Sequence, residues 1–242
     1  MKIAIAQVKP VKGDIQSNIK SHLKFIKLAS SNNANCIFFP ELSLTGYEPE
    51  LASKLAITIH DGRLLKFQEI CDSKKITIGL GAPTLTQTGI QISMLIFQPE
   101  QAMQTYSKQQ LHSDEFPYFE CGDRQLILNV ETDIIAPAIC FESLQPEHAK
   151  IASELGAQIY IASVAKPQTG IDKAMLHYPM IAKAYSMPVL MSNYVGPSDN
   201  FVNVGSSAVW DKQGNLMAKL DDVNEGLLIF DTVSSETTIH LV

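Results

Sequence analysis

The stretch ITIGLGAPTLTQTGIQISMLIFQPEQAMQTYSK, residues 76–108, decides the fold. Its three apolar runs, 76–82, 91–97 and 103–108, are short, and residues typical of turns separate each run from the next. Neighbouring short strands of this kind pair as antiparallel hairpins. A single sheet of parallel strands has no place for such hairpins, so the middle of the chain excludes that architecture.

Strands alternate with helices on both sides of this stretch. On the N-terminal side we expect strands at 2–8 and 36–40, and helices that begin after Asp14 and after Asp61. The elements expected on the C-terminal side are strands at 125–130, 134–140, 158–163 and 188–193, helices at 146–155 and 172–186, and strands within 207–230. This order favours an α/β fold of two mixed sheets with helices outside. No linker or repeat interrupts it, so we expect residues 1–242 to form one domain.

The composition excludes several classes of protein. The net charge is −6, and no basic cluster exceeds the pair Lys74-Lys75, which argues against a nucleic-acid-binding protein. No apolar run approaches the roughly 20 residues of a membrane span, and the apolar N-terminus is too short for a signal peptide. We therefore expect a soluble cytoplasmic protein. The four cysteines form no C-x-x-C pair and no histidines have zinc-ligand spacing, so neither pattern indicates a zinc site.

Three chemically different side chains each follow a predicted strand directly: Glu41, Lys108 and Cys140. In α/β folds, ligands bind beyond the carboxyl ends of strands. A desolvated carboxylate acts as a general base, a cation stabilises an oxyanion, and a thiolate attacks a carbonyl carbon. Together they predict acyl transfer through a thioester. Taken one at a time, each has an ordinary alternative: a packed cysteine, a solvated glutamate and an edge lysine.

Five segments resemble the nitrilase superfamily, the carbon–nitrogen hydrolases. FFPELSLTGY at 38–47 resembles its glutamate motif, YSKQQL at 106–111 its lysine motif, and ICFE at 139–142, with Pro146-Glu147 behind it, its nucleophile motif. SNYVG at 192–196 and GSSAVWDKQG at 205–214 are similar to its later motifs. The motifs occur in the family's order, and the resemblance covers the chain from Ile3 to about Phe230. It implies a four-layer α-β-β-α sandwich of two mixed sheets.

The resemblance also implies a role for each matched residue. Cys140 is the expected nucleophile, Glu41 the general base, and Lys108 the group that stabilises the tetrahedral intermediate together with the backbone N–H of Phe141. Glu115 is expected to position the substrate and Lys108. The motif residues Tyr47, Phe141 and Glu142 are expected to contact the substrate. The implied reaction cleaves a small linear amide to an acid and ammonia and requires no metal or organic cofactor. The family usually forms homodimers or higher homo-oligomers.

Two positions depart from the family pattern. Many members have a glutamate on the late helix where this chain has Tyr185, and many have an arginine shortly after the nucleophile, where this chain has Ser143 and Leu144. Arginine is the usual partner of a substrate carboxylate. Because it is missing here, and because Glu48 and Glu50 follow the Glu41 loop, we expect a neutral or weakly cationic amide to be preferred.

Other functions remain open at this point. The protein could be an N-carbamoyl amine hydrolase, a glutaminase-like subunit that supplies ammonia to a partner synthetase, or a non-catalytic binding protein. A Cys–His hydrolase would pair Cys140 with His148 or His177, although we expect His148 to be exposed on its helix and to point away. The sequence SVAK at 163–166 matches S-x-x-K, a pattern of serine nucleophiles that is expected by chance. The apolar segment Met187–Met191 is either part of a homodimer interface or a buried strand.

Overall fold

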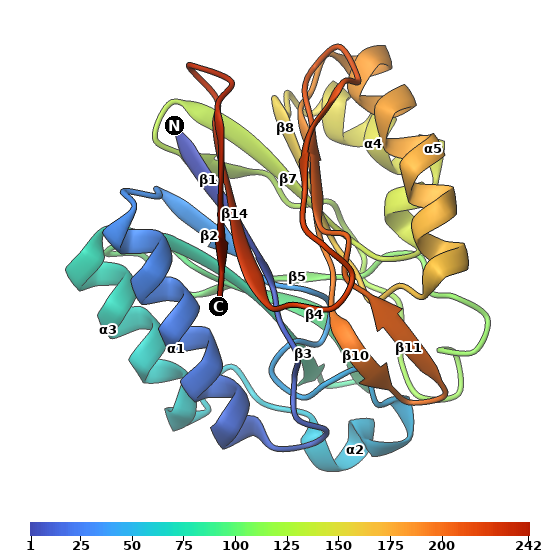
Figure 1. The fold of residues 1–242 in the computed structure, drawn as a ribbon. Helices are drawn as coiled ribbons and strands as arrows, with labels where there is room; N and C mark the ends of the chain where they lie inside the picture. The colour runs from blue at the N-terminus through green and yellow to red at the C-terminus, as the bar shows by residue number, and fades with distance from the viewer.

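Two large β-sheets face each other at the centre of the molecule, and helices cover both outer faces (Figure 1). The computed structural model describes all residues from Met1 to Val242. α1 and α3 cover one sheet, and α4 and α5 cover the other (Figure 1). The predicted four-layer α-β-β-α sandwich is therefore confirmed.

The first sheet has the strand order β15-β14-β1-β2-β3-β4-β5. Its three central strands β1, β2 and β3 are parallel, and the outer strands are antiparallel to their neighbours. The predicted hairpins of residues 76–108 form β3, β4 and β5. The strand bounds are β1 Lys2–Gln7, β2 Cys36–Phe38, β3 Thr77–Leu85, β4 Ile90–Phe97, β5 Gln104–Ser107, β14 Gly226–Asp231 and β15 Thr237–Leu241.

The second sheet has the order β13-β12-β9-β8-β7-β6, with β7, β8 and β9 parallel. Its strands are β6 Leu128–Val130, β7 Asp133–Ile139, β8 Ile159–Ser163, β9 Val189–Ser192, β12 Ala208–Trp210 and β13 Leu216–Lys219. A separate hairpin consists of β10 Val195–Ser198 and β11 Phe201–Val204. β6 is shorter than the predicted 125–130, and ahead of it the Gln125 side chain contacts β7, donating from Nε2 to the Pro137 carbonyl at 2.9 Å.

Five α-helices complete the layers: α1 Ile15–Ser31, α2 Ala52–Leu55, α3 Leu65–Lys74, α4 Pro146–Glu154 and α5 Gln168–Tyr185. Asp14 caps α1 as predicted, since its carboxylate accepts a hydrogen bond from the Ser17 N–H at 3.0 Å. Asp61 caps a 3₁₀ turn, Gly62–Leu64, that leads into α3. α5 begins four residues before the predicted start, with Pro167 at its N-cap.

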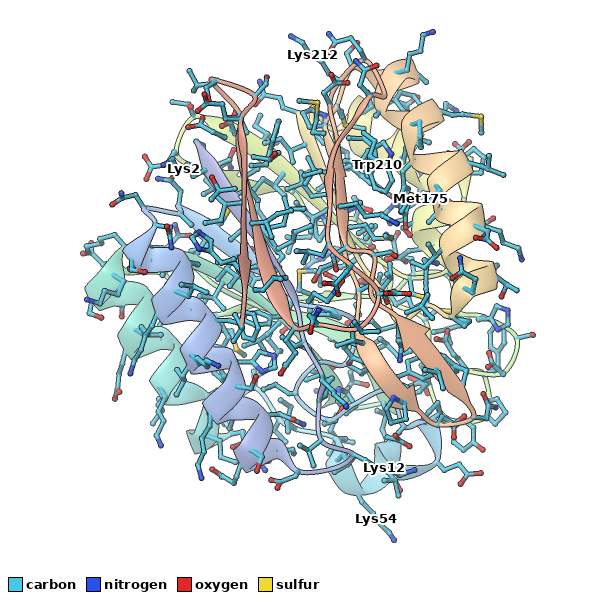
Figure 2. All side chains as sticks on the ribbon, viewed as in Figure 1. Lys2, Lys12, Lys54, Met175, Trp210 and Lys212 are labelled. Atoms are coloured by element: carbon cyan, nitrogen blue, oxygen red, sulfur yellow. The ribbon has the colours of Figure 1, made fainter.

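Side-chain size sets the spacing of the layers around the second sheet. In β7, Ile135 and Ile139 belong to the core between the sheets, whereas Ala136 and Ala138 face α4 and α5. The alanines of β7 leave room on that face for larger side chains of the neighbouring strands and of α5, such as Tyr160 and Tyr178. Trp210 of β12 lies on the α5 side, near Met175 (Figure 2).

The apolar segment Met187–Met191 lies inside this packing. Met187 and the β9 residues Val189, Leu190 and Met191 are buried within the chain itself, so the segment is a core strand and not an interface. The homodimer stays a prediction without support from this segment. None of the helices has the length and apolar character that crossing a membrane requires.

Candidate active site

Three strand ends meet at the boundary between the two sheets. Glu41 follows β2, Lys108 follows β5 and Cys140 follows β7. Lys108 Nζ donates to Glu41 Oε1 at 2.7 Å and to the two oxygens of Glu115 at 2.6 and 2.8 Å. The structure therefore brings together the four residues predicted as catalytic, although they are distant in the sequence.

The Glu41 loop is held by its contact with β3. The Leu44 N–H donates to the Gly81 carbonyl at 2.9 Å, and the Gly81 N–H donates to Ser43 Oγ at 3.1 Å. Ser43 Oγ also lies 2.9 Å from Nε2 of the buried His22 on α1. A Cβ at residue 81 would lie only 2.2 Å from the Leu42 nitrogen, so only glycine permits this approach.

Lys108 continues the line of β5 beside β4. Its N–H donates to the Ile92 carbonyl at 2.9 Å, and its carbonyl accepts from the Gly122 N–H at 2.7 Å. A Cβ at residue 122 would lie 2.2 Å from the Ser107 carbonyl oxygen, so glycine is required there too. Because these two hydrogen bonds fix its backbone, Lys108 holds its ammonium group between the carboxylates of Glu41 and Glu115.

Cys140 sits on a strained turn. Its φ of 48° lies in the left-handed region, which costs a residue other than glycine about 1–3 kcal/mol. Its N–H donates to the Ser163 carbonyl at 3.0 Å, and Ser143 Oγ donates to the Cys140 carbonyl at 2.5 Å. These bonds hold the turn between β7 and the following 3₁₀ helix, Glu142–Leu144, and the Cys140 side chain faces the cavity described below.

Burial and neighbouring charges shift the pKa values of the site. Burial raises the pKa of Glu41, Lys108 lowers it and Glu115 raises it, with a net shift above the ordinary value. Burial would lower the pKa of Lys108, but Glu41 and Glu115 raise it above its usual range. Burial and Glu41 raise the pKa of the Cys140 thiol to about 11, although Lys166 and Lys108 act to lower it. The Cys140 thiol is therefore neutral at rest. The second oxygen of Glu41, Oε2, accepts no hydrogen bond.

A cavity of about 640 Å³ opens in front of Cys140. Tyr47 and Phe141, both predicted to contact the substrate, line it. The Tyr47 hydroxyl donates to Glu115 Oε1 at 3.0 Å, and the backbone N–H of Phe141 has no acceptor in the protein. A polar N–H beside a nucleophile can receive the oxyanion of an attacked carbonyl.

Glu142 does not line the cavity, which corrects its predicted place in the substrate site. Both of its oxygens are occupied: Oε1 accepts from the Tyr106 hydroxyl at 2.6 Å and the Ile139 N–H at 2.7 Å, and Oε2 accepts from the Gln109 N–H at 2.6 Å. Burial raises its pKa to about 7. Glu142 stabilises the Cys140 turn, because its carboxylate connects Ile139, directly before Cys140, to Gln109, directly after Lys108.

His148 is buried, so the expectation that it is exposed was wrong. Its ring nitrogens lie 2.8 Å from the Tyr106 hydroxyl and 2.7 Å from the Tyr160 hydroxyl. Helical periodicity alone did not reveal these tyrosines, which come from two other strands. His177 lines the cavity, but neither histidine forms a hydrogen bond with Cys140, so the geometry does not support a Cys–His pair.

The charge of the cavity also differs from expectation. Glu48 is buried and paired with Lys12 at 2.6 Å, and neither it nor Glu50 lines the cavity. Lys166 and Lys173 do line it, and Lys166 Nζ lies 3.9 Å from Cys140 Sγ. The part of the expected preference for a neutral amide that rested on Glu48 and Glu50 is therefore wrong, whereas the absence of an arginine after Cys140 still stands, because no arginine lines the cavity. The only sequence signal for Lys166 was the S-x-x-K match, which points to a different chemistry.

No group of three or more histidine, cysteine, aspartate or glutamate side chains in the structure is arranged to hold a metal ion.

A sequence model of the carbon-nitrogen hydrolase family matches residues 2–238. The chain belongs to this family. Among its curated relatives is a glutamine-dependent NAD(+) synthetase of Thermotoga maritima, 26% identical over 227 residues, an alignment that covers 90% of this chain and 39% of the relative. The chain thus spans about two fifths of the length of that synthetase. An (R)-stereoselective amidase of Pseudomonas sp. is 24% identical over 222 residues, which cover 90% of this chain and 80% of the amidase.

Solved structures with this fold include an amidase from Nesterenkonia sp. AN1 that carries acrylamide added at its active site cysteine. It superposes with a TM-score of 0.87 at 21% identity, over 97% of this chain and 94% of the amidase. At this identity the likeness establishes the four-layer fold. Membership of the family establishes that the chain is a carbon–nitrogen hydrolase of the nitrilase superfamily.

Proposed function

We propose that this hydrolase cleaves a small linear amide to a carboxylic acid and ammonia through a thioester on Cys140. The observation that carries the proposal is the buried Glu41–Lys108 pair, joined at 2.7 Å beside the Cys140 thiol at the wall of the cavity. A base, a cation and a nucleophile in one desolvated site supply the groups that acyl transfer needs.

The first stage forms the thioester. Glu41 accepts the thiol proton as Cys140 Sγ bonds to the amide carbon, and Lys108 Nζ and the Phe141 N–H stabilise the negative charge on the carbonyl oxygen. The tetrahedral intermediate collapses when the C–N bond breaks and Glu41 returns the proton to the leaving nitrogen. Ammonia departs, and the acyl group remains on the sulfur.

The second stage releases the acid. Glu41, again a carboxylate, takes a proton from water, whose oxygen attacks the thioester carbon. The C–S bond then breaks, the proton passes to Cys140 Sγ, and the enzyme returns to its resting state. Glu115 holds the Lys108 ammonium through both stages, because it accepts from Nζ with both oxygens.

The comparisons support amide cleavage in particular. The Pseudomonas relative is named an amidase, and the Nesterenkonia amidase carries its adduct at a cysteine. The test is a panel of linear amides, ureido acids and nitriles assayed for ammonia, with Cys140→Ala as the control. Ammonia from amides that disappears in Cys140→Ala supports the proposal. Turnover of ureido acids alone favours an N-carbamoyl amine hydrolase, and turnover of nitriles alone refutes the amidase assignment.

A glutaminase is the second candidate function. The alignment with the glutamine-dependent NAD(+) synthetase covers 90% of this chain, and the name of that relative includes its use of glutamine. A glutaminase of this kind would supply ammonia to a synthetase partner. Including glutamine in the amide panel distinguishes the two candidates, and copurification of a synthetase with the tagged chain would support the second.

A further inference from the structure

A second lysine faces the nucleophile. Lys166 follows β8, its side chain is 4% exposed, and its Nζ lies 3.9 Å from Cys140 Sγ. No carboxylate lies within 4.0 Å of this ammonium group, whereas Lys108 binds both Glu41 and Glu115. Lys166 lines the cavity in front of Cys140, and no acidic partner accounts for the position of its ammonium group beside the sulfur.

The backbone of Lys166 is fixed in this position. Its N–H donates to Asn193 Oδ1 at 2.9 Å, and its carbonyl accepts from Asn193 Nδ2 at 3.2 Å. The stem of the side chain packs over Gly170 in the first turn of α5, where a Cβ would lie 3.1 Å from Lys166 Cβ. The ammonium group therefore points at the sulfur because of its backbone and packing, not because an acid attracts it.

The charges of the site balance only when Lys166 is counted. At rest, the two carboxylates Glu41 and Glu115 face the two ammonium groups of Lys108 and Lys166, and Cys140 is a neutral thiol. When Glu41 takes the thiol proton, the negative charge moves to the sulfur. Lys108 is then still bound by both oxygens of Glu115, at 2.6 and 2.8 Å. The cation that remains for the sulfur is Lys166.

We propose that Lys166 is a further catalytic residue that stabilises the thiolate form of Cys140. The proposal rests on the proposed function only in taking Cys140 as the nucleophile. The other titratable and charged groups that face this part of the cavity are His112, Asp114, Lys173 and His177. Asp114 is paired with His112 and Lys173 is exposed, and none of the four has a hydrogen bond to Cys140 Sγ.

The test measures alkylation of Cys140, because alkylation by iodoacetamide reports on the thiolate and requires no amide hydrolysis. The variant is Lys166→Met, which keeps the length of the side chain and removes the charge. Lys166→Arg tests rescue by a cation. The matched control is Lys183→Met, the same change at an exposed lysine of α5 outside the cavity. Mass spectrometry of the Cys140 peptide separates its reaction from that of the exposed Cys121.

An opposite charge at this distance shifts a pKa by about 1–3 units. We therefore expect the pH profile of alkylation in Lys166→Met to move upward by about 1–3 units and the rate at pH 7 to fall by at least about tenfold. Lys166→Arg should recover most of the rate, and Lys183→Met should match the wild type. A second neutral variant, Lys166→Gln, gives the same readout if Lys166→Met does not fold.

Two results would overturn the proposal. One is an unchanged iodoacetamide profile in folded Lys166→Met or Lys166→Gln. The other is a loss confined to the anionic reagent iodoacetate, which would make Lys166 a binding group for substrate anions instead. A wild-type protein whose Cys140 alkylates normally but releases ammonia from no amide would refute the proposed function and leave this inference standing.

Discussion

Replacing Gly81 by alanine should damage the site without touching any of its reactive groups. The new Cβ would lie 2.2 Å from the Leu42 nitrogen and 2.5 Å from the Pro40 carbonyl oxygen. Ordinary contacts of a Cβ begin near 3.4 Å, so the loop that carries Glu41 must move by about 1.2 Å. A displacement of about 1 Å in a catalytic group can cost about 10²-fold in rate. We therefore expect a loss of that size in kcat.

Overpacking at this position should also lower stability, by about 1–3 kcal/mol. The matched control is Gly62→Ala, because no atom lies within 4 Å of a Cβ built at residue 62. That variant should keep full activity and gain about 0.4–1 kcal/mol from reduced freedom of the unfolded chain.

The assay combines kcat on the best amide of the panel with thermal unfolding of both variants. Wild-type kcat in a folded Gly81→Ala protein would refute the argument that backbone contact with β3 sets the position of Glu41.

Four other outcomes are expected. Cys140→Ala should abolish turnover, whereas Cys121→Ala should retain it, since Cys121 is exposed outside the cavity. Ammonia release by purified Cys140→Ala would exclude Cys140 as the nucleophile. Glu41→Gln should lower kcat about 10²–10⁴-fold, and Lys108→Met should lower it about 10²–10³-fold. The double variant should lose less kcat than the product of these two factors. A loss equal to that product would mean that the two groups act separately. Because burial raises the pKa of Glu41, kcat/KM should fall on acidification with a midpoint above 4.5, the ordinary pKa of a glutamate side chain. A midpoint at or below that value would assign the acid limb to another group. Burial lowers the pKa of His22 to about 4 from 6.5, so the unfolded chain binds more protons at this residue between these pH values. The contribution of His22 to stability should fall by about 2 kcal/mol from pH 7 to pH 5, measured as the change in the stability difference between wild type and His22→Gln in urea unfolding at the two pH values.

Sequence patterns predicted the parts of the fold that depend on neighbours along the chain. The hairpins of β3, β4 and β5, the cap at Asp14 and the strands before Glu41, Lys108 and Cys140 all follow from local periodicity and turn residues. The convergence of the catalytic candidates was inferred from strand ends together with the family resemblance. Only the structure gives the distances between these side chains, such as the 2.7 Å between Lys108 Nζ and Glu41 Oε1.

The errors share a physical origin, because each concerns a polar side chain that meets residues from another sheet or helix. His148 is buried against tyrosines of β5 and β8, Glu142 is bound by the chain after β5, and Lys166 meets Cys140 across two strand ends. Hydrophobic periodicity reports the burial of apolar groups and gives no information about satisfied polar ones. The early start of α5 is a separate error, because Pro167 stands at the N-cap and offers no side chain that caps the helix.

The catalytic candidates are divided between the two halves of the sandwich: Glu41 and Lys108 come from one sheet and Cys140 from the other. Their alignment therefore depends more on the relative position of the two sheets than on the strand pairing within either sheet. The Glu142 carboxylate crosses that boundary, since it accepts from the Ile139 N–H on one side and the Gln109 N–H on the other. A slight sliding of one sheet over the other would separate base from nucleophile while every strand stayed paired. Under the proposed mechanism, the rate of amide cleavage therefore reports the relative position of the two sheets, which circular dichroism does not detect.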